Sequence, residues 1–165
     1  MQTYTSANTS INSAKLPKVY SSVDMTGLVL DYGCGRYIGH IRTHLKQSGA
    51  ELLPYDPYNQ TPEVNSGSMN IVNKALRTGR KLNIVCSNVL NVIDDDATVK
   101  RIAKRLEYLA TKSGGRAYIT VYEGNKSGVG RRTGTDQYQR NEPLRNYLQW
   151  FSNARIQKNM IVIGG

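Results

Sequence analysis

The stretch LVLDYGCG, residues 28–35, decides the fold. Its first half is a short apolar run, and its second half contains two glycines, which permit a tight turn and let a ligand lie against the backbone. After this turn, Ile38, Ile41 and Leu45 recur at helical spacing. A strand, a glycine-rich turn and a helix in this order are typical of α/β domains that bind a ligand at the start of the helix.

The rest of the chain continues to alternate between strands and helices. We expect further strands over residues 51–55, 82–93, 116–122 and 156–163, and further helices over 68–77, 94–113 and 138–152. Segment 82–93 is the most apolar and does not alternate with polar residues, which predicts a central strand buried on both faces. The pattern predicts an α/β fold: a single Rossmann-like three-layer αβα sandwich over residues 25–165, with a mostly parallel sheet.

Three segments carry little core material. Residues 1–24 are rich in Ser, Thr and Asn and read as a polar leader, with a helical turn near Lys18 to Val23. Residues 59–67 form a polar loop in this interpretation. Residues 123–137 form a long, basic, Gly-rich loop, and loops of this length are usually functional or disordered.

Length and composition narrow the class of protein. A chain of 165 residues fits one domain. Its apolar runs are shorter than the ~20 residues of a membrane span, and its first residues lack a secretory signal, so we expect no membrane partner and a cytoplasmic location. Cys34 and Cys86 lie in apolar stretches and read as buried thiols. With His40 and His44 as the two histidines, we expect no metal site.

The net charge is strongly positive. Lys and Arg number 22 against 12 Asp and Glu, which gives a formal charge of +10. Such a charge suits a polyanionic partner such as DNA or RNA, because phosphate contacts release counterions. The basic residues are spread along the chain, so solvated helix faces are the alternative explanation.

Ligands of parallel sheets bind beyond the carboxyl ends of the strands. The first strand ends on Asp31 and the glycine turn, where the G-x-G-x-x-G pattern of dinucleotide sites fails because Ile38 takes the place of its last glycine. The second ends on Asp56, a carboxylate that can accept hydrogen bonds from ribose hydroxyls or merely form an Asp-Pro turn. The third ends on SNVLNV, residues 87–92, whose short polar residues can face a ligand.

Together, VLDYGCG, YDP and IVCSNVLNVI resemble the motifs of class I S-adenosylmethionine-dependent methyltransferases. More narrowly, they are similar to the methyltransferases that accompany DNA phosphorothioation systems and to small phage or bacterial relatives. The resemblance spans residues 28–93, and its general fold extends to about residue 124. It implies S-adenosylmethionine as cofactor, bound by Asp31, Gly33, Cys34, Gly35, Asp56, Pro57, Tyr58, Ser87, Asn88 and Val89.

The sequence also departs from the family's pattern. Tyr37 stands where many members have a third glycine, and the N-P-P-Y or D-P-P-Y signature of many amino-methyltransferases is missing. The usual final antiparallel hairpin is expected to be shortened to the single strand 156–163, which would trim the C-terminal edge of the sheet. The acceptor atom therefore stays open.

Methyl transfer from a sulfonium is an in-line displacement that works mainly by alignment and desolvation. If a proton must leave the acceptor, the candidate catalytic residues are Glu123, Tyr122 and Tyr138. A nucleic-acid substrate would contact basic residues in and after the long loop. The candidates are Lys126, Arg131, Arg132 and Arg140.

Three functions therefore stay open. The first is a methyltransferase, with nucleic acid or a small metabolite as acceptor. The second is an enzyme that cleaves S-adenosylmethionine without an acceptor. The third is a non-catalytic nucleic-acid-binding or regulatory module on a methyltransferase-like fold, because a fold alone does not decide function. Cofactor binding separates the third from the other two.

Overall fold

A computed structural model describes residues 15–165 of the chain. These residues form four α-helices, α1 (Lys18–Ser22), α2 (Gly39–Gln47), α3 (Pro62–Thr78) and α4 (Asp96–Ser113), and two 3-10 helices, η1 (Leu90–Val92) and η2 (Leu144–Trp150). The strands are β1 (Gly27–Tyr32), β2 (Ala50–Tyr55), β3 (Leu82–Ser87), β4 (Arg116–Thr120), β5 (Arg131–Gly134), β6 (Gln137–Gln139), β7 (Arg155–Gln157) and β8 (Met160–Ile163).

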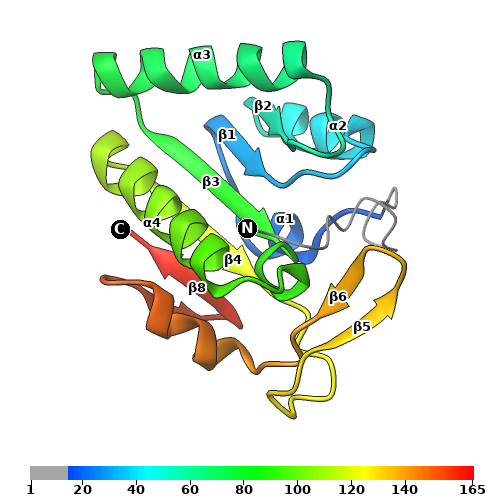
Figure 1. Ribbon diagram of the computed structural model, residues 1–165. Helices are drawn as coiled ribbons and strands as arrows, with labels where there is room; N and C mark the ends of the chain where they lie inside the picture. Colours follow the sequence, from blue (N-terminus) through cyan, green and yellow to red (C-terminus); the bar gives the residue numbers. More distant parts are fainter. Residues whose placement is uncertain (1–14) are drawn as a thin grey trace.

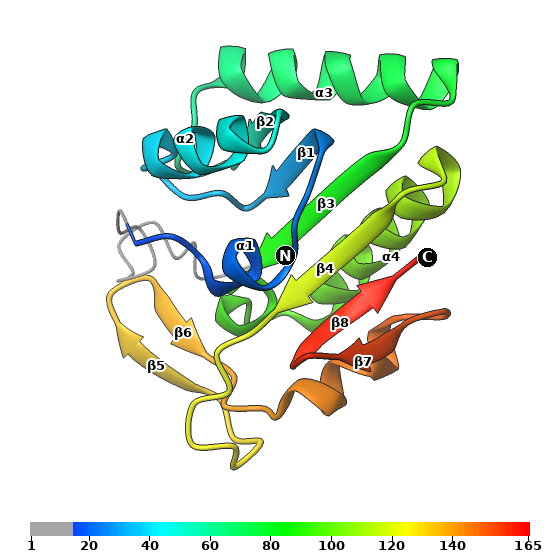
Figure 2. The ribbon, with the colours of Figure 1, turned by 180° about the vertical axis from the view of Figure 1, so that it is seen from behind.

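Six strands form the main sheet, in the order β2-β1-β3-β4-β8-β7 (Figure 1). The first four pair in parallel, and β8 runs antiparallel between β4 and β7. Strands β5 and β6 form a separate hairpin beside the carboxyl ends of β3 and β4 (Figure 2). The predicted α/β class, mostly parallel sheet and central position of β3 are confirmed, and the arrangement is compatible with a Rossmann-like sandwich.

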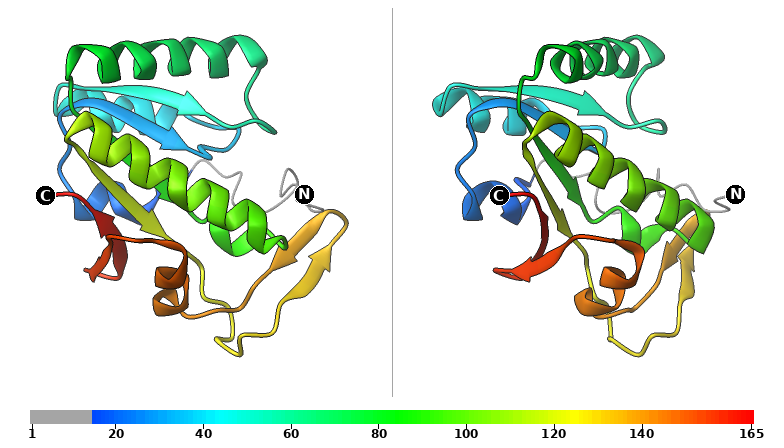
Figure 3. Two further views of the ribbon diagram at one scale, coloured as in Figure 1. Left: turned by 60° about the vertical axis from the view of Figure 1, so that its left-hand side comes forward. Right: turned by 90° about the vertical axis from the view of Figure 1, so that its left-hand side faces the viewer.

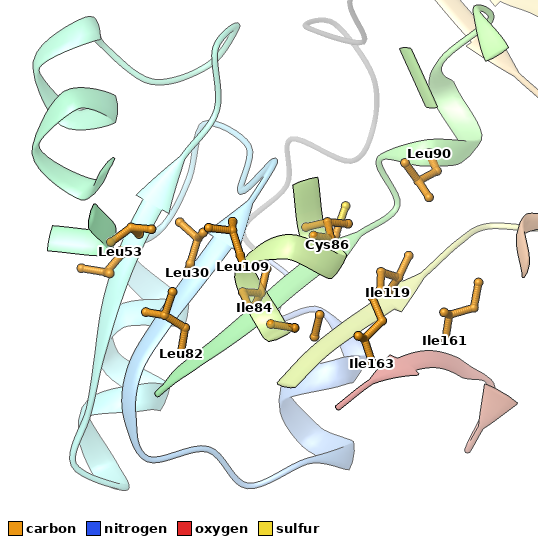
Figure 4. Close-up of a cluster of buried hydrophobic side chains, with 14 of the residues drawn as sticks. Leu30, Leu53, Leu82, Ile84, Cys86, Leu90, Leu109, Ile119, Ile161 and Ile163 are labelled. Atoms are coloured by element: carbon orange, nitrogen blue, oxygen red, sulfur yellow. The ribbon is translucent and has the colours of Figure 1, made fainter. Parts of the chain in front are cut away.

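Side chains of the central strands alternate between two hydrophobic cores, one on each face of the sheet. Leu30, Ile84 and Ile119 belong to the larger core, where α3, α4 and η2 supply the covering side chains (Figure 4). Val29 and Val85 point to the opposite face, which α1 and α2 cover. Helices on both faces of one sheet give three layers, and Figure 3 shows them from the side. Strands buried on both faces explain why their sequences are almost entirely apolar.

The two long helices begin and end at polar and glycine signals. Thr61 caps α3 by accepting a hydrogen bond from the Val64 amide, and Gly79 ends the helix in the left-handed region. Helix α3 therefore starts at Pro62 rather than near residue 68, because Pro is favoured in the first helical turn. Asp95 caps α4, and Gly114 ends it as predicted.

The C-terminal third differs most from the sequence-based expectation. The predicted helix over 138–152 is strand β6 followed by η2, and the long loop contains β5. The predicted single strand 156–163 is wrong as well: β7 and β8 form an antiparallel hairpin, so the C-terminal edge is not shortened. Lys158 and Asn159 form its turn with φ of 51° and 59°, the left-handed pair that two-residue hairpins use.

The first described residues pack onto the sheet. The helical turn expected near Lys18 to Val23 is present as α1, and its Val19 and Tyr20 are buried with Met25 in the smaller core. The remainder of the polar leader, residues 1–14, lies outside the described residues. At the other end of the sheet, β2 is an edge strand that contains Pro54.

Candidate functional site

A cleft of about 1850 Å³ opens at the carboxyl ends of β1 and β3. From β1 the chain crosses to β2 on one side and then returns to β3 on the other, so these two ends flank the point where the strand order reverses. Open α/β sheets bind ligands at this switch point, because the loops there diverge and leave a crevice. Described parts of α1, the β5–β6 hairpin and α4 complete its walls.

Gly33 makes the turn after β1 possible. Its φ is +90°, which favours glycine, and a Cβ at this position would clash with the side chain of Val89. Val89 follows β3, so this close approach brings the first and third strand-end segments together. Asn88 takes a left-handed φ of 57°, and its amide donates to the Thr120 carbonyl at 2.9 Å.

The backbone amides of the glycine turn are all used within the protein. The amides of Gly33 and Cys34 donate to the Tyr55 carbonyl at 2.8 and 3.1 Å, and that of Gly35 donates to Asp56 Oδ2 at 2.9 Å. Phosphate-binding turns instead point such amides at the ligand. The turn therefore disfavours a pyrophosphate, in agreement with the absence of a G-x-G-x-x-G pattern.

Asp56 is buried and organises the loop after β2. Its Oδ1 accepts from the amides of Tyr58 and Asn59 at 3.0 and 3.1 Å. Its Oδ2 accepts from Gly35 and, at 3.3 Å, from Asn59 Nδ2. A carboxylate offers about four acceptor positions, so this one is fully used. The longest bond, to the Asn59 side chain, is the one that a ligand hydroxyl can replace most easily.

Asp31 lies deeper, with 2% of its surface exposed. Its carboxylate accepts a hydrogen bond from the Tyr20 hydroxyl at 2.5 Å. Burial raises the pKa of Asp31 to about 7, the bond from Tyr20 opposes this rise, and the charge of Asp56 adds to it. Burial, followed by the charge of Asp31, raises the pKa of the Tyr20 hydroxyl well above its ordinary value. Among the described residues no ion pair with Asp31 is found.

The structure brings all ten predicted cofactor residues to this cleft. Asp31, Gly33, Cys34, Gly35, Asp56, Pro57, Tyr58, Ser87, Asn88 and Val89 all line it. They come from three segments that are far apart in sequence and meet at the ends of β1, β2 and β3. Their role as cofactor contacts stays a prediction.

The three candidate catalytic residues also line the cleft. Glu123 is the most constrained, because its Oε2 accepts from the Leu144 amide at 2.8 Å and its Oε1 lies 3.9 Å from Lys126 Nζ. It thereby holds the start of η2. Tyr122 is 63% exposed, and Tyr138 is half-buried on β6.

The four candidate substrate residues separate into different environments. Lys126 lines the cleft, and Arg131 and Arg132 are exposed on β5 outside its lining. Arg140 is not on a surface at all. Its guanidinium donates to the Ile93 carbonyl and pairs with Asp96 at 2.8 Å, which ties the base of the β5–β6 hairpin to η1 and α4. Arg140 is buried, makes internal contacts and lies outside the cleft lining, so the geometry does not support the predicted contact of this residue with a substrate.

Gln139 was not foreseen as a cleft residue, and Asn91 was foreseen only as part of the segment 87–92, without a role of its own. Gln139 Nε2 donates to the Tyr122 carbonyl at 2.9 Å, and its Oε1 accepts from Asn91 Nδ2 at 3.1 Å. Asn91 Oδ1 is buried and receives no hydrogen bond within the described residues. The second Asn of SNVLNV, polar within an apolar run, was the available signal.

Other ligand types find less support in the described part of the chain. Residues 15–165 contain no group of three His, Cys, Asp or Glu side chains suited to a metal ion. None of the described helices combines the length and the apolar character needed to cross a bilayer. Cys34 and Cys86 are free thiols, partly and fully buried.

The chain matches no protein-family model, no curated protein and no solved structure. The function therefore has to be inferred from the cleft itself. Three features of the cleft are available for that inference. The amides of the glycine turn donate within the protein, two acids are buried, and polar residues follow β3.

Proposed function

We propose that this chain is an S-adenosylmethionine-dependent methyltransferase with a Rossmann-like sandwich. The observation that carries the proposal is the meeting of Asp31, the glycine turn and Asp56 around one cleft at the switch point of the sheet. The motif resemblance, drawn from the sequence of the same three segments, also supports it.

The charge of the cleft floor suits a cation. Asp31 lines the cleft, is buried, and forms no ion pair within residues 15–165. A buried carboxylate without a cationic partner is unfavourable, so a ligand that brings positive charge gains more here than a neutral one. S-adenosylmethionine carries a sulfonium and an ammonium group. It has no phosphate, which agrees with a glycine turn whose amides are already used.

Asp56 fits the ribose of such a ligand under one condition. Its four acceptor positions are occupied by donors of its own loop and by the Gly35 amide, so a ribose hydroxyl has to displace the Asn59 side chain, held at 3.3 Å. The backbone donors Gly35, Tyr58 and Asn59 would keep the carboxylate in place during this exchange. Tyr58, 48% exposed beside it, offers an aromatic face to adenine.

When bound, the cofactor supplies a methyl group that is already activated for displacement. The protein's task is then to align the acceptor and to exclude water. The walls from α1 and from the β5–β6 hairpin enclose the cleft for this purpose. Glu123 keeps spare acceptor positions on both oxygens, so it can take a proton from an acceptor.

One observation favours a second candidate function. The Asp56 carboxylate is fully used within the protein, by Tyr58 and Asn59 of its own loop and by Gly35 of the turn after β1, which is what a purely structural role would show. In that case the chain is a non-catalytic interaction module. An enzyme that cleaves S-adenosylmethionine would use the same cofactor contacts, and analysis of products formed without an acceptor separates it from a methyltransferase.

Calorimetric titration of the purified protein tests the proposal. We expect saturable binding of S-adenosylmethionine, no binding of NAD⁺, and loss of binding in Asp56→Asn. The matched variant Asn59→Ala removes the exchangeable side-chain contact to Asp56 and keeps the carboxylate, so it should bind as tightly as the wild type or more tightly. Absence of S-adenosylmethionine binding by the wild type would refute the methyltransferase and leave the interaction module.

A further inference from the structure

The rim of the cleft is basic on several sides. Basic side chains reach its lining from α1, from α4, from the loop after β4, from η2 and from the β7–β8 turn: Lys18, Arg101, Arg105, Lys126, Arg145 and Lys158. The acids in the lining are fewer. Asp31 and Asp56 are buried, and Glu123 pairs with Lys126. The rim that a ligand meets first is therefore positive, although the floor is acidic.

The β5–β6 hairpin extends this basic surface and is held firmly at its base. Arg131 and Arg132 are exposed on β5. At the base, the Gly128 amide donates to the Asn141 carbonyl at 2.9 Å, and Asn141 Nδ2 donates to the Val129 carbonyl at 3.0 Å. Arg140 anchors the same base to η1 and α4. Figure 1 and Figure 3 show the hairpin projecting beside the strand ends as an arm.

Aromatic side chains share the lining of the cleft with the basic residues. Tyr122 is 63% exposed and lines the cleft, as does the half-buried Tyr138. A single exposed tyrosine is common on protein surfaces. Inside a basic groove, however, its ring provides a face on which a nucleobase can stack, and any of the bases can stack in this way.

The buried Asn91 side chain has an oxygen that could accept a hydrogen bond from a ligand. The bonds from Gln139 to Tyr122 and from Asn91 to Gln139 fix which end of each amide is the donor. Asn91 Oδ1 is thereby left as an acceptor without a donor in the described structure, on a side chain that lines the cleft. Leaving such an atom unpaired costs free energy, so an N–H group of a ligand would be favoured there.

We propose that the groove between the β5–β6 hairpin and α4 binds a single nucleic-acid strand, whose phosphates contact the basic rim while one unpaired base stacks on Tyr122 above Asn91. As the identity of the methyl acceptor, this proposal rests on the proposed function. As a binding surface, it can be tested without the cofactor. The base would then lie next to the cleft that holds the strand-end segments.

The shape of the surface favours nucleic acid over other polyanions. A membrane would need the basic groups on one exposed face, whereas these line the walls of a cleft. An acidic peptide could pair with the rim and donate a backbone N–H to Asn91, but it does not carry a flat base next to every negative charge. A single strand offers both phosphates and unpaired bases, which matches a cleft lined by basic side chains and by tyrosine rings.

Fluorescence anisotropy with labelled oligonucleotides tests the proposal. The oligonucleotides are single-stranded DNA, single-stranded RNA and duplex DNA of about twelve nucleotides, a length suited to single-strand sites. We expect the single strands to bind more tightly than the duplex, with affinity falling as salt rises. Arg101→Gln with Arg105→Gln should weaken binding roughly tenfold and reduce the salt slope by about 1.4, since each phosphate contact contributes ~0.7. Arg131→Gln with Arg132→Gln should act in the same direction.

Two matched controls remove the same chemistry elsewhere. Lys74→Gln with Arg77→Gln neutralises two exposed charges on α3, outside the cleft lining, and should change affinity less than twofold. Tyr122→Leu should weaken binding roughly five- to hundredfold without changing the salt slope. Tyr37→Leu removes a tyrosine that is equally exposed, at 50%, and lies outside the lining, and it should have no effect.

Absence of saturable oligonucleotide binding at low salt would overturn the proposal. An equal loss of affinity in the Lys74/Arg77 control and in the Arg101/Arg105 variant would do so too. Tighter binding of the duplex than of both single strands would overturn it as well. The cofactor titration keeps the two proposals apart. Oligonucleotide binding without S-adenosylmethionine binding refutes only the methyltransferase, and the reverse result refutes only the nucleic-acid groove.

Discussion

The variant Asp31→Asn removes one ionisable group from the floor of the cleft while keeping its shape and an oxygen that can accept from Tyr20. In the unfolded chain Asp31 ionises near its ordinary pKa of 3.8, whereas in the folded protein burial raises this pKa to about 7. Between these two pH values the folded state binds more protons than the unfolded state. The free energy of unfolding therefore falls as pH rises, by ~1.4 kcal/mol per pH unit.

Over the whole interval this loss amounts to at most about 4 kcal/mol, and it levels off about one pH unit above the folded-state pKa, where the carboxyl is ionised in the folded state as well. The Asp31→Asn variant has no carboxyl group at this position and therefore does not undergo this loss of stability. We therefore expect the variant to gain stability over the wild type as pH rises from 4.5 to 8, and to keep a constant advantage at higher pH. Urea unfolding at half-unit steps of pH measures the difference directly. A difference that does not change with pH, or a less stable variant at pH 8, would refute the reasoning.

Further predictions concern the glycine turn, the hairpin anchor, the cleft thiol and the cofactor. Gly33→Ala should lower stability by about 1–3 kcal/mol from strain and the clash with Val89, and Val89→Ala in the same chain should restore part of it, measured as a double-mutant cycle by urea unfolding. Arg140→Leu should cost about 1–3 kcal/mol by leaving the Ile93 carbonyl unpaired, and it should speed amide exchange in β5 and β6; unchanged exchange would contradict the anchor. Burial raises the pKa of the Cys34 thiol, so alkylation at pH 8 should be slow and slower still with bound S-adenosylmethionine, as mass spectrometry can follow. Because Asp31 must ionise to pair with a cation, S-adenosylmethionine should bind more tightly at pH 8 than at pH 6 in the wild type but not in Asp31→Asn; an equal pH dependence in both would contradict the role of Asp31.

The sequence was informative wherever local signals and tertiary structure agree. The strongest signals are those that exclude most other local structures. They are the apolar runs of β1 and β3, the turn at Gly33 and the helix end at Gly114. The β7–β8 hairpin was missed because its turn uses Lys158 and Asn159 in left-handed conformations, without the glycine that usually marks such a turn. The apolar residues of β8 then merged with Ile156 into one apparent strand.

The position of the cleft was predictable from the sequence, but its hydrogen bonds and ion pairs were not. Residues after parallel strands must meet at one edge, which is why the three strand-end segments could be brought together from sequence, while the ten individual positions came from the motif resemblance. Whether Arg140 faces solvent or Asp96 depends on contacts between distant segments, and charge by itself favours the surface. The pairing of Tyr20 with Asp31 lies in the same category, since it joins α1 to β1 across the smaller core.

Pro54 has a consequence for how the protein behaves at high concentration. It lies in β2, at one free edge of the sheet, and it cannot donate a hydrogen bond to an incoming strand. The opposite edge, β7, is only three residues long and exposed, with Arg155 in the strand and Lys158 in the turn beside it. Both open ends of the sheet therefore resist edge-to-edge aggregation, and growth into fibrils by added strands is disfavoured at either side.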